Sequence, residues 1–281
     1  MSALSPACLD VMFIRQTGQF QQHGCTELQW RFARQRCVME QEIFSAQDQY
    51  GQIRVLEDNG VRTLNFGGPD AQSSWHKSEP HVPQLEYVRA MLLVLLFNTP
   101  KQTLTLGLGA GTLNSSLHAG IAGLKQQVVE LRPGVIEAAQ RFFQLPQGKR
   151  LQLHQADAFE FMRSYQGKKL DVIFSDLYNA DDAEGEQFSA EFLENCRRQL
   201  KVGGWLVLNC WDCHQSDEFM QLLHTHFCDV RSCLLSSGNW VVFAGTNPAP
   251  NNAKALKDQE WSLSKQLGFS LSPYLGRLVS H

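Results

Sequence analysis

The chain has 281 residues, which is enough for one large domain and a small accessory region. With 43% hydrophobic and 19% charged residues, it has the composition of a globular protein that buries a sizeable core. The formal net charge of −3 excludes a strongly basic chain, so nucleic acid is not an expected partner.

Signals for membrane insertion and export are not evident in the sequence. The longest apolar run, Met91 to Phe97, is far shorter than the ~20 residues of a membrane-spanning helix. The first residues, MSALSPACLD, lack the basic start and apolar stretch of a signal peptide. We therefore expect a cytoplasmic protein without a membrane partner, whose eight cysteines are free thiols rather than disulfides.

The first third of the chain is predicted to hold a small β region. Residues 1–45 show no clear hydrophobic period and are assigned to an N-terminal extension. Residues 46–82 are assigned to the β region, because Asn59-Gly60 supplies the positive φ angles of a tight hairpin turn between alternating apolar residues. Residues 67–83 are expected to be a polar loop, and residues 84–97 a helix with apolar side chains on one face.

From residue 101 onward, predicted strands alternate with helices. The predicted strands are Thr103–Gly109, Gln126–Leu131, Leu151–Gln155, Leu170–Asp176, Trp205–Cys210, Val230–Ser237 and Asn239–Gly245. The predicted helices are Leu113–Ala119, Pro133–Phe143, Ala158–Arg163, Gln187–Leu200 and Asp217–Phe227. This alternation indicates an α/β domain at residues 83–247, with a mostly parallel sheet covered on both faces and a closing strand pair. Residues 248–281 are expected to form a C-terminal tail with a linker at 248–255 and a helix near Glu260–Leu267.

A glycine-rich turn follows the first predicted strand of this domain. Gly107, Gly109 and Gly111 let the backbone turn sharply and approach a ligand, although such a triplet also suits an ordinary strand-to-helix turn. Glu130 ends the next strand, where a carboxylate can accept hydrogen bonds from a ribose diol. Because the spacing is G-x-G-x-G with Thr112 next, we expect a nucleoside cofactor without a pyrophosphate.

Two further acidic residues follow predicted strands. Asp157 precedes Ala158 after the third strand of the domain, and Asp176 ends the fourth strand. Since ligands of open α/β sheets bind at the carboxyl ends of the strands, these carboxylates and Glu130 are expected to line one crevice. Asp157 also suits a helix N-cap, and Asp176 also suits a solvated loop.

Together these motifs resemble the spermidine synthase family of polyamine aminopropyltransferases over about residues 45–245. The resemblance implies the Rossmann-like class I methyltransferase fold, and S-adenosylmethionine or its decarboxylated form as donor substrate. It implies donor binding by the glycine turn, Glu130, Asp157 with Ala158, and Gln72, and a catalytic role for Asp176. It also implies a small-molecule acceptor such as a polyamine, and a homodimer. Independently of the resemblance, Tyr178 is a candidate to assist Asp176 from the same loop, and an aromatic side chain there also suits closing the pocket.

The sequence departs from the family pattern in two places. On the helix before the glycine turn, Tyr87-Val88-Arg89 stands where the family has Tyr-His-Glu. After Asp176, the residues Leu177-Tyr178-Asn179-Ala180 also differ from the family pattern. Fewer carboxylates are then available for a cationic acceptor. Arg89, if it faces the crevice, would favour the donor that keeps its carboxylate. Three hypotheses follow: an aminopropyltransferase, a small-molecule methyltransferase, and a binding protein without turnover.

Other signals receive a structural interpretation. Cys210-Trp-Asp-Cys213-His214 matches a haem attachment pattern, but it ends a predicted sheet strand without a second ligand pair, so no metal is expected. His76 and His81 lie in the predicted loop 67–83, where a lid is the preferred interpretation. No G-x-S-x-G elbow is present, which disfavours a hydrolase.

Overall fold

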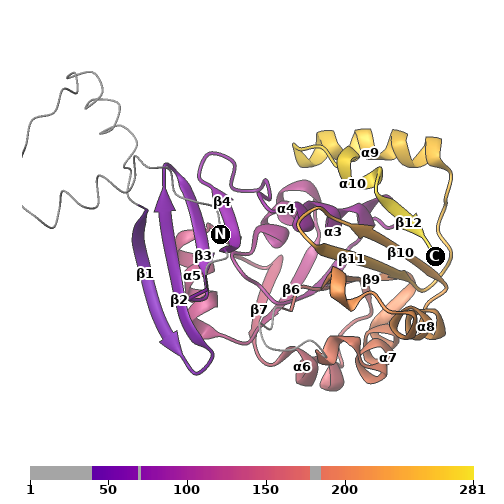
Figure 1. Ribbon diagram of the computed structural model, residues 1–281, viewed down its shortest axis with the longest axis horizontal. Coiled ribbons are helices and arrows are strands. Elements are labelled where there is room, and N and C mark those ends of the chain that lie inside the picture. Colours follow the sequence, from indigo (N-terminus) through magenta and orange to yellow (C-terminus); the bar gives the residue numbers. More distant parts are fainter. Residues whose placement is uncertain (1–39, 69–70, 178–184) are drawn as a thin grey trace, which may run out of the picture. The chain divides into compact units, whose positions relative to one another are not determined.

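Two β-sheets organise the part of the chain that the computed structural model describes, which is residues 40–68, 71–177 and 185–281 (Figure 1). These residues belong to one compact unit, Glu40–His281. The small sheet has four antiparallel strands in the order β1-β2-β3-β4. The large sheet has eight strands in the order β12-β10-β11-β9-β8-β5-β6-β7.

The small sheet contains more strands than the sequence pattern indicates. Its strands are β1 (Gln41–Asp48), β2 (Gly51–Asp58), β3 (Val61–Asn65) and β4 (Ala71–His76). The predicted hairpin joins β2 and β3, and Asn59 and Gly60 both have positive φ angles, 49° and 82°. Strand β4 corrects the prediction of a continuous loop over residues 67–83. Its first four residues, AQSS, carry no apolar alternation that a sequence pattern could detect, and Trp75 is its one large apolar side chain.

The large sheet confirms the predicted α/β class. Five parallel strands run from its middle to one edge: β5 (Gln102–Leu106), β6 (Lys125–Glu130), β7 (Leu151–Gln155), β8 (Leu170–Ser175) and β9 (Leu200–Trp211). Strand β11 (Asn239–Gly245) runs antiparallel to β9, followed by β10 (Asp229–Leu234) and β12 (Leu278–Ser280). Strand β12 comes from the tail at residues 248–281, so the tail extends the sheet instead of standing apart from it.

Helices cover both faces of the large sheet (Figure 1). One face carries α3 (Glu86–Met91), the 3₁₀ helix η1 (Leu92–Leu96), α4 (Thr112–Gly120), α9 (Ala253–Leu267) and α10 (Ser272–Leu275). The other carries α6 (Ala158–Ser164), η2 (Glu186–Phe188), α7 (Ala190–Gln199) and α8 (Asp217–His226), with η3 (Asp212–His214) after β9. Helix α5 (Pro133–Phe142) packs against the small sheet. Helix α9 starts within the predicted linker 248–255.

The strand order reverses at β5, and this reversal creates the place where a ligand can bind. From β5 the chain moves outward through β6 and β7, then returns to the other side of β5 with β8 and β9. The carboxyl ends of β6, β5 and β8 are therefore neighbours, and in open α/β sheets such a switch point is the ligand crevice. Within the described residues, no helix has both the length and the apolar character needed to cross a membrane.

Candidate functional site

The glycine turn after β5 fits its neighbours so closely that a side chain has no room. At Gly107, with φ of 88°, a Cβ atom would lie 2.2 Å from the carbonyl oxygen of Asp176. At Gly109, with φ of 55°, it would lie 2.7 Å from Ser73 Oγ. Gly111 has a φ of 73° and immediately precedes α4. The turn is therefore held between the end of β8 and the small sheet, which only glycine permits.

Glu130 lies beside this turn at the end of β6. Its Oε2 accepts the backbone N–H of Leu108 at 3.0 Å, and its Oε1 accepts the N–H of Arg132 at 2.9 Å. The side chain is buried, and this burial raises the pKa of Glu130, while the backbone N–H groups of Arg132, Leu108 and Leu131 and the Arg132 charge lower it in part. The carboxylate is thus fixed in orientation, with further lone pairs on both oxygens available to a ligand.

Arg132 links Glu130 to the small sheet. Its guanidinium makes a bidentate pair with Asp48, with Nε to Oδ2 and Nη2 to Oδ1 both at 2.9 Å, and also donates to the carbonyl of Gly51. The centre of the Phe66 ring lies 4.7 Å from the guanidinium carbon. A planar guanidinium held on three sides positions its own backbone N–H, which is the group that binds Glu130. This connection joins segments far apart in sequence, and sequence reasoning missed it.

The small sheet also reaches the glycine turn directly. Ser73 Oγ in β4 accepts the backbone N–H of Ala110 at 3.1 Å. Gln72, a predicted donor-binding residue, is its half-buried neighbour at an irregularity in the β3–β4 pairing. Such irregularities redirect side chains, and they are common next to binding sites. The structure thus brings Gln72 near the turn through Ser73, while its donor contact stays a prediction.

Asp157 has the capping role that the sequence suggests. It precedes α6, and its Oδ1 accepts the backbone N–H groups of Phe159 and Glu160, each at 2.9 Å. Ala158 is the buried first residue of that helix. Since Ala156 N–H binds the carbonyl of Glu130 at 3.1 Å, Asp157 follows the strand end next to Glu130. The N-cap is confirmed, and contact with an adenine stays a prediction.

Asp176 lies on the other side of the glycine turn and is held at both oxygens. Its backbone N–H binds the carbonyl of Leu106 at 2.9 Å, which fixes it beside the carboxyl end of β5. Asn209 Nδ2 donates to Oδ1 at 2.8 Å, and the Tyr87 hydroxyl donates to Oδ2 at 3.2 Å. Burial raises the pKa of Asp176, and the hydrogen bonds from Asn209 and Tyr87 lower it in part. A carboxyl group with a raised pKa at a sheet switch point is suited to accept a proton.

Tyr87 and Asn209 are site residues that sequence reasoning did not assign. Burial and the nearby Asp176 raise the pKa of Tyr87 well above its usual value, so its hydroxyl stays a donor. A sequence signal existed for Asn209, because asparagine is depleted in strands and this one interrupts the buried run of β9. A signal for Tyr87 also existed, because it keeps the tyrosine of the family's Tyr-His-Glu pattern. It was passed over because an aromatic residue on an amphipathic helix usually belongs to the core.

Arg89 lies elsewhere. Its Nε donates to the carbonyl of Pro83 at 2.6 Å, and its guanidinium lies 5.4 Å from the ring centre of Phe269. Residues two positions apart on a helix face different directions, so with Tyr87 directed at Asp176, Arg89 is directed away from it. The structure therefore does not bring Arg89 together with the other predicted donor-binding residues. Recognition of a donor carboxylate required the Arg89 guanidinium to face the crevice, and it lies against Pro83 and Phe269 instead.

The remaining sequence signals have local explanations or fall outside the structure. Tyr178 lies outside the described residues. Cys210 is buried and Cys213 is exposed, while His214 Nδ1 accepts the backbone N–H of Trp211 at 3.0 Å. Among the described residues, no group of three or more His, Cys, Asp and Glu side chains is arranged to hold a metal ion.

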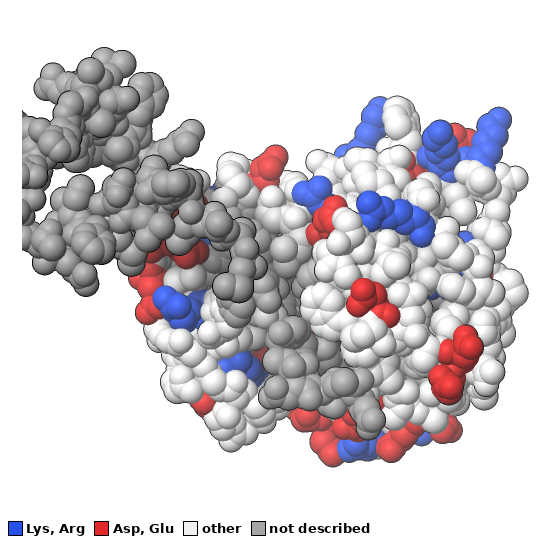
Figure 2. All heavy atoms as spheres, in the orientation of Figure 1, with Lys and Arg blue, Asp and Glu red and all other residues white. Residues whose placement is uncertain are grey.

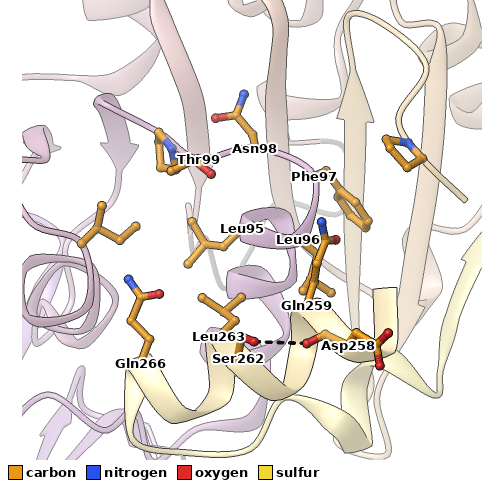
Figure 3. Close-up of a pocket in the computed structure, with 13 residues that line it drawn as sticks. Leu95, Leu96, Phe97, Asn98, Thr99, Asp258, Gln259, Ser262, Leu263 and Gln266 are labelled. Carbon is orange, nitrogen blue, oxygen red and sulfur yellow. Dashed lines mark hydrogen bonds between the residues drawn. The ribbon is translucent and has the colours of Figure 1, made fainter. Parts of the chain in front are cut away.

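A separate groove of about 610 Å³ lies between the segment Leu95–Pro100 and helix α9 (Figure 3). Leu95 and Leu263 face one another across it, and Asn98 and Gln266 lie near its ends. None of the predicted site residues lines it. On the face shown in Figure 2, charges of both signs are interspersed, and Lys and Arg gather over α9.

Comparison with known proteins gives consistent results. The family model described as "Spermine/spermidine synthase domain" matches residues 87–234. A polyamine aminopropyltransferase of Chromobacterium violaceum is 27% identical over 233 residues, which covers 81% of this chain and 89% of that protein.

Two solved structures share the fold. A spermidine synthase in complex with the transition-state analogue AdoDATO has a TM-score of 0.62 and 21% identity, covering 84% of each chain. Human methyltransferase-like protein 13 in complex with SAH has a TM-score of 0.60 and 21% identity, covering 66% of this chain and 93% of that one.

These likenesses confirm the expected methyltransferase-like fold and support a transferase. The family match spans more than half of the chain, and it includes the glycine turn, Glu130, Asp157 and Asp176. The chain belongs to the spermine/spermidine synthase family.

Proposed function

We propose that the protein transfers an aminopropyl group from decarboxylated S-adenosylmethionine to a small amine. The observation that carries this proposal is the row of strand ends, with Glu130, the glycine turn and Asp176 side by side. A carboxylate fixed for a diol, a turn open to close approach, and a carboxyl group with a raised pKa are the three groups that such a transfer needs. The names of the aminopropyltransferase relative and of the spermidine synthase neighbour support it.

Each proposed role follows from one contact. Glu130 would accept hydrogen bonds from the ribose hydroxyls, because its two backbone donors leave acceptor positions unused. The glycine turn would lie against the nucleoside. Asp157, with Oδ1 occupied by the cap of α6, would offer Oδ2 to the adenine amino group.

The chemistry assigned to Asp176 is that of a general base. The acceptor enters as an ammonium, and Asp176 takes one of its protons. The free amine then attacks the carbon beside the positively charged sulfur. The carbon–nitrogen bond forms as the carbon–sulfur bond breaks, and the bonding electron pair stays on sulfur as a neutral thioether. Tyr87 and Asn209 hold Asp176 in place during these steps.

Methyl transfer is the alternative, and it uses the same site with the carboxylated donor. A guanidinium beside the carboxylate of S-adenosylmethionine would favour it. Arg89 instead binds Pro83 and Phe269, so we rank aminopropyl transfer first. The by-product distinguishes the two, because aminopropyl transfer releases methylthioadenosine and methyl transfer releases S-adenosylhomocysteine.

The test combines binding and turnover. Calorimetry with both donors and with methylthioadenosine is expected to show binding, and Glu130→Gln to weaken it by about 10-fold or more, the value of one charged hydrogen bond. Mass spectrometry of reactions with a panel of mono-, di- and triamines is expected to show methylthioadenosine release. Replacing Asp176 by Asn should lower kcat by about 10²–10⁴-fold and leave donor binding intact.

Absence of binding by all three adenosyl compounds would contradict the whole proposal. Binding without turnover by any amine would support the third hypothesis, a binding protein. A cytoplasmic location and a homodimer remain predictions, and size measurement in solution tests the second.

A further inference from the structure

Asp176 is the end of a chain of side-chain hydrogen bonds that crosses two strands. Asn209 Nδ2 donates to Asp176 Oδ1 at 2.8 Å. Asn239 Nδ2 donates to Asn209 Oδ1 at 3.1 Å. Ser237 Oγ donates to Asn239 Oδ1 at 2.8 Å. Each asparagine therefore donates toward the carboxylate and accepts from the residue behind it, and Ser237 is the donor at the far end.

The pairing of β9 with β11 brings the two asparagines together. Asn239 is opposite Trp211 and Val241 is opposite Asn209, so the asparagines are diagonal neighbours on the same face of the sheet. Helix α3, which carries Tyr87, packs on this face. Ser237 lies in the turn that precedes β11, where Gly238 has a φ of 87°.

The direction of these hydrogen bonds follows from the charge at their end. An ionised carboxylate only accepts, so Asn209 must present its NH₂ group to Asp176. Its carbonyl oxygen then requires a donor, which is the NH₂ group of Asn239. Asn239 is buried, so leaving its own oxygen unpaired would be costly, and the Ser237 hydroxyl supplies the donor.

We infer that Ser237, Asn239 and Asn209 form a relay that keeps Asp176 ionised and oriented for proton transfer. Asn239 and Ser237 are then positioning residues of the reaction, although neither touches Asp176. Without Asn239, the Asn209 amide can turn over and direct its oxygen at Asp176, which favours the protonated carboxyl. The inference rests on the proposed function only for the catalytic purpose of the relay. The effect of the relay on the pKa of Asp176 is measurable without substrate.

The test is a double-mutant cycle read by carboxyl ¹³C NMR, with the Asp176 signal identified by its loss in Asp176→Asn. Asn239→Leu is expected to raise the pKa of Asp176 in the otherwise unchanged protein. In the Asn209→Leu background, where the connection to Asp176 is already broken, Asn239→Leu is expected to cause no further change in the pKa of Asp176. An equal shift in both backgrounds overturns the relay, because a general structural effect of Asn239 is additive.

Ser237→Ala tests the same inference at an exposed turn, where the fold tolerates the change. It is expected to raise the pKa of Asp176 in the same direction by less. An unchanged Asp176 titration in this variant and in Asn239→Leu also overturns the relay. These outcomes are independent of donor binding, so failure of the relay and failure of the proposed function are distinguishable.

In turnover assays, Asn239→Leu is expected to lower kcat about 5- to 10-fold near neutral pH, the equivalent of one lost hydrogen bond. The KM for the donor should stay unchanged. Activity should recover at higher pH, where Asp176 is ionised regardless of the relay. A loss that is the same at every pH contradicts the positioning role.

Discussion

The hydroxyl of Tyr87 and the carboxylate of Asp176 are 3.2 Å apart although 89 positions separate them in the chain. Tyr87 lies on the helix ahead of the glycine turn, and Asp176 follows the strand on the far side of it. The contact holds the proposed general base between the helical layer and the sheet. It also means that the proton affinity of Asp176 depends on residues from α3 and β9 together.

The first prediction concerns the pH dependence of transfer. Tyr87→Phe removes a hydrogen bond that lowers the pKa of Asp176, so this pKa should rise and the acidic limb of the kcat profile should move to higher pH. Near neutral pH we expect about a fivefold loss of kcat, from one hydrogen bond. The check is a kcat profile against pH for both proteins. Activity that does not recover on the alkaline side contradicts an action through Asp176.

The second prediction concerns stability. The folded-state pKa of Asp176 is raised, so the folded protein binds this proton more tightly than the unfolded chain does. Its contribution to stability therefore falls as pH rises from the unfolded pKa through the folded pKa. Asp176→Asn avoids this loss and keeps compatible partners, since Asn Oδ1 can accept from Asn209 while its NH₂ group donates to Tyr87.

Urea unfolding of Asp176→Asn and the unchanged protein at acidic and alkaline pH measures this effect. The variant should be the more stable protein at alkaline pH, and the difference should vanish at acidic pH. A variant that is less stable at alkaline pH would show that the charged carboxylate stabilises the fold, contrary to the argument from burial.

The third prediction concerns the glycine turn. Gly107→Ala places a Cβ atom 2.2 Å from the Asp176 carbonyl oxygen at a φ of 88°, so both strain and overlap oppose it. We expect a loss of about 3–5 kcal/mol in the free energy of unfolding. Gly123→Ala is the matched control, because its φ is 73° and no atom lies within 4 Å of the new Cβ. It should cost only about 1–2 kcal/mol. Equal costs for both changes would show that contact with Asp176 is unimportant.

The fourth prediction concerns the connection between the sheets. Asp48→Asn breaks the bidentate pair with Arg132 and should cost about 1.5–3 kcal/mol at neutral pH. It should also weaken donor binding, because Arg132 holds Glu130 through its N–H. The Arg132 guanidinium lowers the pKa of Asp48, so this stabilisation exists above the unfolded pKa and disappears as pH falls through the folded pKa.

Glu42→Gln is the control for Asp48→Asn, since it removes an ion pair with Arg54 at the exposed surface of the same sheet. It should cost less than about 1 kcal/mol and leave donor binding unchanged. Chemical unfolding at neutral and strongly acidic pH, with calorimetry of donor binding, checks both variants. If Asp48→Asn leaves donor affinity intact, the small sheet does not support the Glu130 site.

The sequence by itself determined the α/β alternation, the glycine turn, and the acidic residues Glu130, Asp157 and Asp176 at strand ends. These features are local, because hydrophobic periods and turn residues act over a few positions. Strands β1, β4 and β12 were missed because pairing partners, rather than their own patterns, make them strands.

Only the tertiary structure decided which side chains surround the strand ends. It joined Asp176 to Tyr87 and Asn209, joined Arg132 to Asp48, and directed Arg89 toward Pro83 and Phe269. Such contacts depend on strand order and on the packing of helices across the sheet. Spacing along the chain carries no information about either, because residues far apart in sequence become neighbours only when the sheet is assembled.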